Sequence, residues 1–114
     1  MSSISTHVLD TVTGKPAPGI PVRLDKWLPG TDGSEQWQSI ARGATDPDGR
    51  CHHLAAEAPE GLYRLRFDVH SYFTHRGRTS IYLDITIQFQ CNGEAHYHLP
   101  LLLSDNSYTT YRGS

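Results

Sequence analysis

Residues 81–90 read Ile-Tyr-Leu-Asp-Ile-Thr-Ile-Gln-Phe-Gln, and this stretch decides the fold class. Every odd position is apolar and most even positions are polar, which is typical of a β-strand with one buried face. Residues 62–69 alternate in the same way, with Tyr63, Leu65, Phe67 and Val69 expected to face inward. Helical periodicity is nearly absent, so the pattern predicts an all-β protein.

The rest of the chain fits a series of short strands separated by turns. Residues 20–24 and 37–41 are two more predicted strands, and Asn92-Gly93 is the strongest hairpin signal because a type I′ turn needs positive φ at both central residues. The other turn sequences lie at 13–16, 29–33 and 46–49, and the only helical candidates are 55–58 and 71–75. Seven or eight strands at this spacing predict a β-sandwich.

Length and composition narrow the class of protein. The 114 residues suit a single domain, 1–114, and a net charge of −2 without a basic stripe argues against nucleic acid as a partner. We find no membrane-spanning segment, no signal peptide and no C-terminal peroxisomal tripeptide, and we therefore expect a cytoplasmic protein. In such a compartment Cys51 and Cys91 are expected to be reduced thiols.

Histidines are unusually frequent, with seven in the chain. His96 and His98 are two residues apart on a predicted strand, so their side chains share a face. This spacing also occurs in zinc sites, but no nearby carboxylate or cysteine completes a ligand set. His7 lies in a short β-prone run and is either a structural or a functional histidine. The remaining four are expected at the surface: His52, His53, His70 and His75.

The end of the chain also allows two interpretations. Residues 99–103 are almost entirely apolar, and we expect their outward side chains to be buried in an interface. Residues 108–114 then keep strand propensity up to Ser114, where chain ends usually carry indifferent polar residues. This terminal segment is either an edge strand or part of a functional site.

Three separated segments carry a family resemblance. They are residues 7–17 (His-Val-Leu-Asp-Thr-Val-Thr-Gly-Lys-Pro-Ala), residues 96–104 (His-Tyr-His-Leu-Pro-Leu-Leu-Leu-Ser) and residues 111–114 (Tyr-Arg-Gly-Ser). Together with Asp46-Pro47-Asp48-Gly49-Arg50, they resemble the transthyretin-like family, and the Tyr-Arg-Gly-Ser ending resembles its hydrolase branch rather than the hormone carrier. The chain departs from the usual family pattern at 81–84, where Phe-Phe-Pro-Glu is common, and at Asp105, where proline is common.

The resemblance implies an eight-stranded transthyretin-like (prealbumin-like) β-sandwich with one short helix. It further implies a homotetramer, a dimer of dimers with active sites in a central channel. The implied activity is hydrolysis of 5-hydroxyisourate to 2-oxo-4-hydroxy-4-carboxy-5-ureidoimidazoline in urate degradation, with no cofactor and no metal. The site residues carried over are His7, Arg50, His98, Tyr111, Arg112, Gly113 and Ser114.

The chemistry of these residue types agrees with hydrolysis. A neutral imidazole can remove a proton from water near pH 7. Arg50 offers a planar cation that matches the carbonyl oxygens of a flat substrate and can stabilise an oxyanion. Whether His7 or His98 is the general base stays open. The main alternative is a carrier of small, thyroid-hormone-like ligands on the same scaffold, because a fold alone does not decide function.

Overall fold

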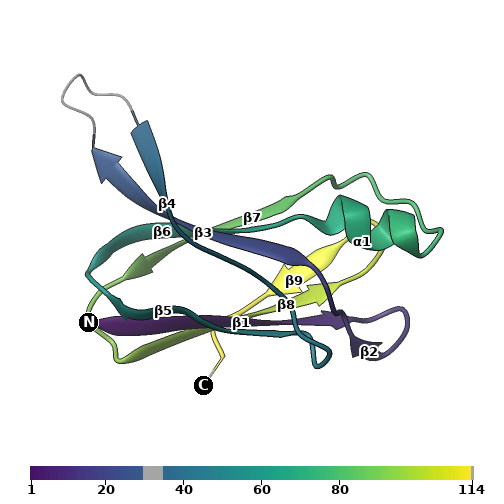
Figure 1. The fold of residues 1–114 in the computed structure, drawn as a ribbon, viewed down its shortest axis with the longest axis horizontal. Helices are drawn as coiled ribbons and strands as arrows, with labels where there is room; N and C mark the ends of the chain where they lie inside the picture. The colour runs from purple at the N-terminus through teal and green to yellow at the C-terminus, as the bar shows by residue number, and fades with distance from the viewer. Residues whose placement is uncertain (30–34, 114) are drawn as a thin grey trace.

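The computed structural model describes residues 1–29 and 35–113, without the side chains of Glu35 and His53. They form two β-sheets packed face to face and one short helix (Figure 1). Sheet A contains β1 (Ser2–Asp10), β2 (Lys15–Pro16), β5 (Arg50–Ala58), β8 (His96–Leu103) and β9 (Tyr108–Thr110). Sheet B contains β3 (Pro21–Pro29), β4 (Glu35–Ala44), β6 (Gly61–Phe67) and β7 (Ile85–Cys91), and the helix is α1 (Val69–His75).

The predicted sandwich with one short helix is confirmed, and the core lies between its two sheets. Tyr63, Leu65 and Phe67 alternate along β6 and are all fully buried, as the sequence pattern predicted. From sheet A, Ile4 and Val8 of β1 meet them with no exposed surface. Among the described residues there are eight strands of three or more residues, and β2 is a ninth strand of only two residues.

The pairing around β1 decides what lies on the outer face of sheet A. β1 pairs with β5 antiparallel and with β8 parallel, and the parallel register places Ser3 beside His96 and Ser5 beside His98. Since side chains alternate along a strand, the outward positions of β1 and β8 form adjacent rows. The inward positions of both strands contribute to the core.

The prediction of a strand from residue 81 is wrong at its start. β7 begins at Ile85, and Ile81 and Leu83 are 76% and 65% exposed instead of facing inward. Local hydrogen bonds hold residues 81–84 away from the sheet: the amide of Ile81 donates to Asn106, and Leu83 accepts from the amide of His70. Val69 was expected to end β6 but begins α1, and it is still fully buried.

Two further local predictions fail. Asn92-Gly93 does not close a hairpin, because β7 belongs to sheet B and β8 to sheet A, so this segment crosses between the sheets. Tyr97 fastens the crossing, since its hydroxyl donates to the side-chain oxygen of Asn92 at 2.6 Å and accepts from the Asn92 amide at 2.9 Å. Residues 55–58, a helical candidate, belong to β5.

The apolar run at 99–103 is mostly covered within one chain. Leu99, Leu101 and Leu103 face the core, Pro100 is buried, and Leu102 is half-buried. The expected outward apolar surface is therefore smaller than predicted. Of the other expectations, the helix near 71–75 is confirmed, Cys51 and Cys91 are free and buried, and residues 30–33 of one predicted turn lie outside the described residues.

Candidate active site

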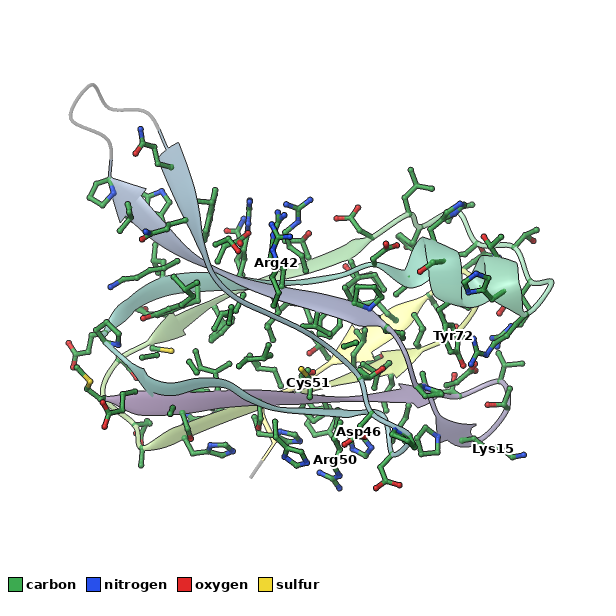
Figure 2. The ribbon with its side chains drawn as sticks, viewed as in Figure 1. Lys15, Arg42, Asp46, Arg50, Cys51 and Tyr72 are labelled. Carbon is green, nitrogen blue, oxygen red and sulfur yellow. The ribbon has the colours of Figure 1, made fainter. Side chains whose placement is uncertain are left out.

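A pocket of about 320 Å³ opens on the outer face of sheet A. Three strands line it, and the side chains that give it its chemistry are Arg50 and His52 from β5 and His96 and His98 from β8. Figure 2 shows Arg50 on the outer side of the sheet, with neighbouring Cys51 on the inner side. The remaining lining residues come from β1: Ser3, Ile4 and Ser5.

Arg50 is held in place by the turn that precedes it. One carboxylate oxygen of Asp46 accepts from the amides of Asp48 and Arg50, both at 2.9 Å. Both hydrogen bonds lower the pKa of Asp46, and the one from the Arg50 amide has the larger effect. Gly49 has a φ of +76°, and a Cβ there would lie 2.4 Å from the carbonyl oxygen of Val8, so only glycine lets the turn pack this closely on β1.

A chain of polar contacts joins the two pocket histidines to β1. The Ser5 hydroxyl lies 2.8 Å from Nδ1 of His98 and 3.4 Å from Nε2 of His96. Nδ1 of His96 contacts the Ser3 hydroxyl, which in turn lies 3.4 Å from the carbonyl oxygen of Ala95. The two imidazole rings are nearly parallel, with 6.2 Å between their centroids.

The surroundings of His98 favour its neutral form. Burial lowers the pKa of the imidazole below its ordinary value, because a buried cation loses its hydration. Nearby basic groups lower this pKa further; in order of effect they are His96, Arg50, His7 and His52. A neutral imidazole at pH 7 has a lone pair that can accept a proton.

His7 lies directly opposite Arg50 in the antiparallel pairing of β1 with β5. Its Nε2 lies 2.9 Å from the carbonyl oxygen of Asp48. Because a carbonyl oxygen can only accept, Nε2 carries a hydrogen, and Nδ1 is the ring nitrogen of His7 that can act as an acceptor. His7 therefore adjoins the pocket through Arg50 but does not line it.

The C-terminal segment lies against β8, one of the strands that line the pocket. The amide of Gly113 donates to the carbonyl oxygen of His98 at 2.8 Å, and a Cβ on Gly113 would lie 2.7 Å from Cδ2 of the His98 ring. Arg112 places its guanidinium 4.8 Å from the ring centroid of Tyr97. Tyr111 is 53% exposed and does not line the pocket, and Ser114 lies outside the described residues.

The structure thus brings together some of the expected site residues and adds others. Arg50 and His98 line one pocket, His7 and Gly113 adjoin it, and neither Tyr111 nor Arg112 is among its lining residues within a single chain. Sequence reasoning missed Ser3 and Ser5, although they alternate with the inward residues of β1 as His96 and His98 do on β8. Only the parallel pairing of the two strands reveals that these rows meet.

Within residues 1–29 and 35–113, no group of three or more described His, Cys, Asp or Glu side chains could hold a metal ion. No helix in this part of the chain is long and apolar enough to cross a membrane.

Comparison with known proteins shows which family this chain is similar to. A model of the HIUase/Transthyretin family matches residues 4–113. The chain is 40% identical to the 5-hydroxyisourate hydrolase of Mus musculus over 116 aligned positions, covering 99% of this chain and 96% of the relative. It is 42% identical to the 5-hydroxyisourate hydrolase of Caulobacter vibrioides, with all of both chains covered.

Solved structures with the same fold include both a hydrolase and a hormone-binding protein. The 5-hydroxyisourate hydrolase of Klebsiella pneumoniae superposes with a TM-score of 0.86 at 36% identity, with all of both chains covered. Sea bream transthyretin in complex with thyroxine gives a TM-score of 0.87 at 36% identity, covering 97% of this chain and 94% of the other. Backbone similarity alone therefore does not separate the two activities.

Proposed function

The chain belongs to the HIUase/Transthyretin family, and we propose that it hydrolyses 5-hydroxyisourate in urate degradation at the pocket on the outer face of sheet A. One observation carries this proposal: a neutral imidazole, His98, and a permanent cation, Arg50, line the same open pocket. Hydrolases from an animal and a bacterium align along essentially the whole chain, which supports the same conclusion.

The reaction needs one water molecule and no cofactor. The water oxygen attacks an acyl carbon of the substrate ring, and the imidazole removes a proton from the water as the new C–O bond forms. Negative charge collects on the former carbonyl oxygen. When the ring C–N bond breaks, that proton passes to the departing nitrogen, which leaves a carboxylic acid and a ureido group in the product.

The polar chain behind His98 indicates which of its nitrogens is basic. The carbonyl of Ala95 can only accept, so Ser3 donates to it and accepts from Nδ1–H of His96. With the hydrogen of His96 on Nδ1, its Nε2 can accept from Ser5, whose single hydrogen is thereby used. Ser5 must accept from Nδ1–H of His98, and the lone pair of His98 is left on Nε2.

We assign the general base to His98 on this ground. Ser5 is a positioning residue, because it fixes the tautomer and the ring orientation of His98 without contacting substrate. Arg50 anchors the planar substrate and stabilises the oxyanion through its guanidinium. His7 assists by holding the water or substrate beside Arg50, with Nδ1 as its acceptor.

The C-terminal residues complete the site in this proposal. Gly113 lets the chain end lie against the edge of the His98 ring, which no larger residue allows. Tyr111 is exposed in one chain, and we propose that it closes the site once chains associate as a dimer of dimers. Arg112 and Ser114 would shape the same region.

The open form of the pocket supports that assembly. Its lining is accessible from one side of sheet A, so a second chain over this face would exclude water and enclose the substrate. The half-buried Leu102 lies on the same face and would add apolar contact. Light scattering at micromolar concentration should return a tetramer mass; a monomer mass would reject the shared site.

A carrier function is less well supported. In small-molecule sites of every kind, the placed polar groups fix the orientation and the specificity of the ligand. The pocket here is lined by one arginine, three histidines and two serines, with Ile4 as its one apolar residue among those described. Such a lining suits a polar, flat substrate better than an aromatic hormone.

The test uses 5-hydroxyisourate generated from urate by urate oxidase. Its decay in the presence of this protein should be much faster than the spontaneous decay, and His98→Ala should remove most of the acceleration. His75→Ala, at the end of α1, serves as the matched control and should leave the rate unchanged. Spontaneous decay unaltered by the wild-type protein would refute the proposed activity.

A further inference from the structure

Three arginines form a row across the outer face of sheet B. The antiparallel register places Arg23 of β3 opposite Arg42 of β4 on one side and opposite Arg66 of β6 on the other. This face is the opposite side of the sandwich from the histidine pocket. Like charges on directly opposed strand positions repel one another and destabilise a sheet, so the row needs a compensating negative charge.

The nearby carboxylates supply only part of that charge. Asp84 pairs with Arg66 at 3.9 Å, which is long for an ion pair. Asp25 is buried, and its carboxylate is shared between two arginines. It lies 3.1 Å from Nε of Arg23 and 2.7 Å from Nε of Arg64. Arg42 has no carboxylate partner among the residues that the structure describes.

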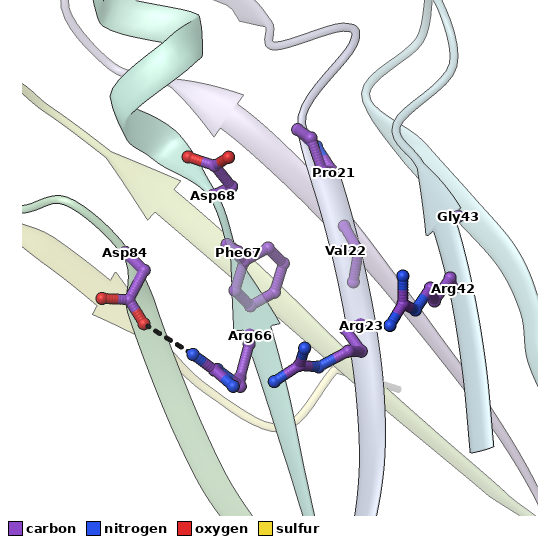
Figure 3. A pocket seen from close by; sticks show the side chains of 9 residues that line it. All are labelled: Pro21, Val22, Arg23, Arg42, Gly43, Arg66, Phe67, Asp68 and Asp84. Carbon is purple, nitrogen blue, oxygen red and sulfur yellow. Dashed lines mark ion pairs between the residues drawn. The ribbon is translucent and has the colours of Figure 1, made fainter. Parts of the chain in front are cut away.

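The row borders a hollow of about 300 Å³, shown in Figure 3. The guanidinium groups of Arg23, Arg42 and Arg66 stand along it, and the backbone of Gly43 borders it next to Arg42. Pro21 and Asp68 border the hollow at its other end. A volume of this size accommodates a small molecule and is too small for a folded partner segment.

We propose that this hollow binds a small multivalent oxyanion, either a phosphate group or a polycarboxylate. A guanidinium presents paired N–H donors that match the oxygens of both groups, and three of them converge here from three strands. The bound anion supplies the negative charge that Asp25 and Asp84 do not, and it relieves repulsion along the row.

The surroundings favour a small anion over an extended polyanion. Asp68 and Asp84 place carboxylates at the border of the hollow, where they would repel the continuing phosphates of a nucleic acid. The net charge of −2 adds a long-range repulsion for such a polymer. Both penalties are smaller for a compact anion, because it carries fewer negative charges and can lie at the arginine end of the hollow.

The experiment follows backbone amide NMR signals while inorganic phosphate or citrate is added at constant ionic strength. We expect saturable shifts at Arg23, Gly43 and Asp68 with at least one of the two anions. The anion that binds with the higher affinity identifies the kind of oxyanion. Arg42→Gln should weaken this binding by about tenfold, since it removes one charged hydrogen-bonding partner. Hydrolysis of 5-hydroxyisourate should stay unchanged in this variant.

Lys15→Gln is the matched control, because it removes the same charge from an exposed residue of sheet A. It should leave the anion affinity within about twofold. Equal weakening by Lys15→Gln and Arg42→Gln would show diffuse attraction instead of a site. Absence of saturable shifts at the row with both anions would also overturn the proposal, and neither result bears on the hydrolase activity.

Discussion

Asp105 accepts hydrogen bonds from the Arg78 guanidinium at 2.9 Å from Nε and 2.6 Å from Nη2. The same guanidinium contacts both carboxylate oxygens of Asp10, which is fully buried and also accepts from the Tyr72 hydroxyl at 2.7 Å. The proline usual at position 105 in the family has no carboxylate to offer. In this chain the cluster ties the end of β1 to the segments that follow α1 and β8.

Asp10→Asn should destabilise the fold strongly. It leaves Arg78 facing a neutral amide in a buried position, and breaking a buried pair costs about 3–5 kcal/mol. Asp105→Asn should cost at most about 1 kcal/mol, because the Asp105 side chain is 40% exposed and solvent screens its charge. Urea unfolding of both variants measures the difference. Equal losses of stability would show that burial does not separate the contributions of the two carboxylates.

Acid should destabilise the protein through the same cluster. Burial opposes ionisation of Asp10, but hydrogen bonds from Arg78 and Tyr72 outweigh it, so its pKa is lowered. A lowered folded-state pKa gives stability that is complete above the unfolded value of about 3.9 and is lost as pH falls through the folded value. Unfolding midpoints measured from about pH 6 to about pH 2 should show this loss. Asp10→Asn should flatten that part of the curve; an unchanged slope would refute the assignment.

The pH–rate profile should report His98. Its pKa is lowered by burial and by the surrounding basic groups, so the rate should fall only below the ordinary histidine value of about 6.5, as Nε2 gains a proton. Ser5→Ala should reduce kcat by between about tenfold and a thousandfold with little change in KM, because the tautomer is no longer fixed. Ser5→Thr keeps the hydroxyl and should retain more activity. An unaltered kcat and pH profile in Ser5→Ala would exclude the positioning role.

Arg50→Ala should lower kcat/KM by about a hundredfold to a thousandfold, the usual loss on removing an oxyanion donor. Arg50→Lys should recover little, since lysine keeps the charge but lacks the planar fork. Melting should change little in both, because the Arg50 side chain is exposed and the turn is held by its backbone amide. Full activity in Arg50→Lys would show that charge alone suffices.

Gly113→Ala should reduce hydrolysis at least about tenfold while leaving the fold intact. The added Cβ would come within 2.7 Å of the His98 ring, so the chain end must move away from the pocket. Deletion of residues 111–114 should be more severe, and Tyr111→Phe milder, because the latter loses only a hydroxyl. Decay of 5-hydroxyisourate and thermal melting of each variant test this order. Normal activity in the deletion variant would show that this ending has no part in catalysis.

The sequence by itself determined the fold class and the family. Alternation along residues 62–67 and 85–89 follows from the period of a strand, and burial of Tyr63, Leu65 and Phe67 follows from that local rule. The separated motifs around His7, His98 and Tyr111 were enough to indicate the hydrolase branch. Such information is contained in short segments and needs no knowledge of pairing.

Only the tertiary structure decided what surrounds the proposed base. Ser5 and His98 are separated by 93 positions, and they meet because β1 and β8 pair in parallel with one particular register. Alternation specifies which face a residue occupies but not which strand lies beside it. The sequence around Asn92-Gly93 is therefore compatible both with a hairpin and with the observed crossing between the two sheets. Strand order is set by the packing of the whole core, and the neighbours of His98 follow from that packing.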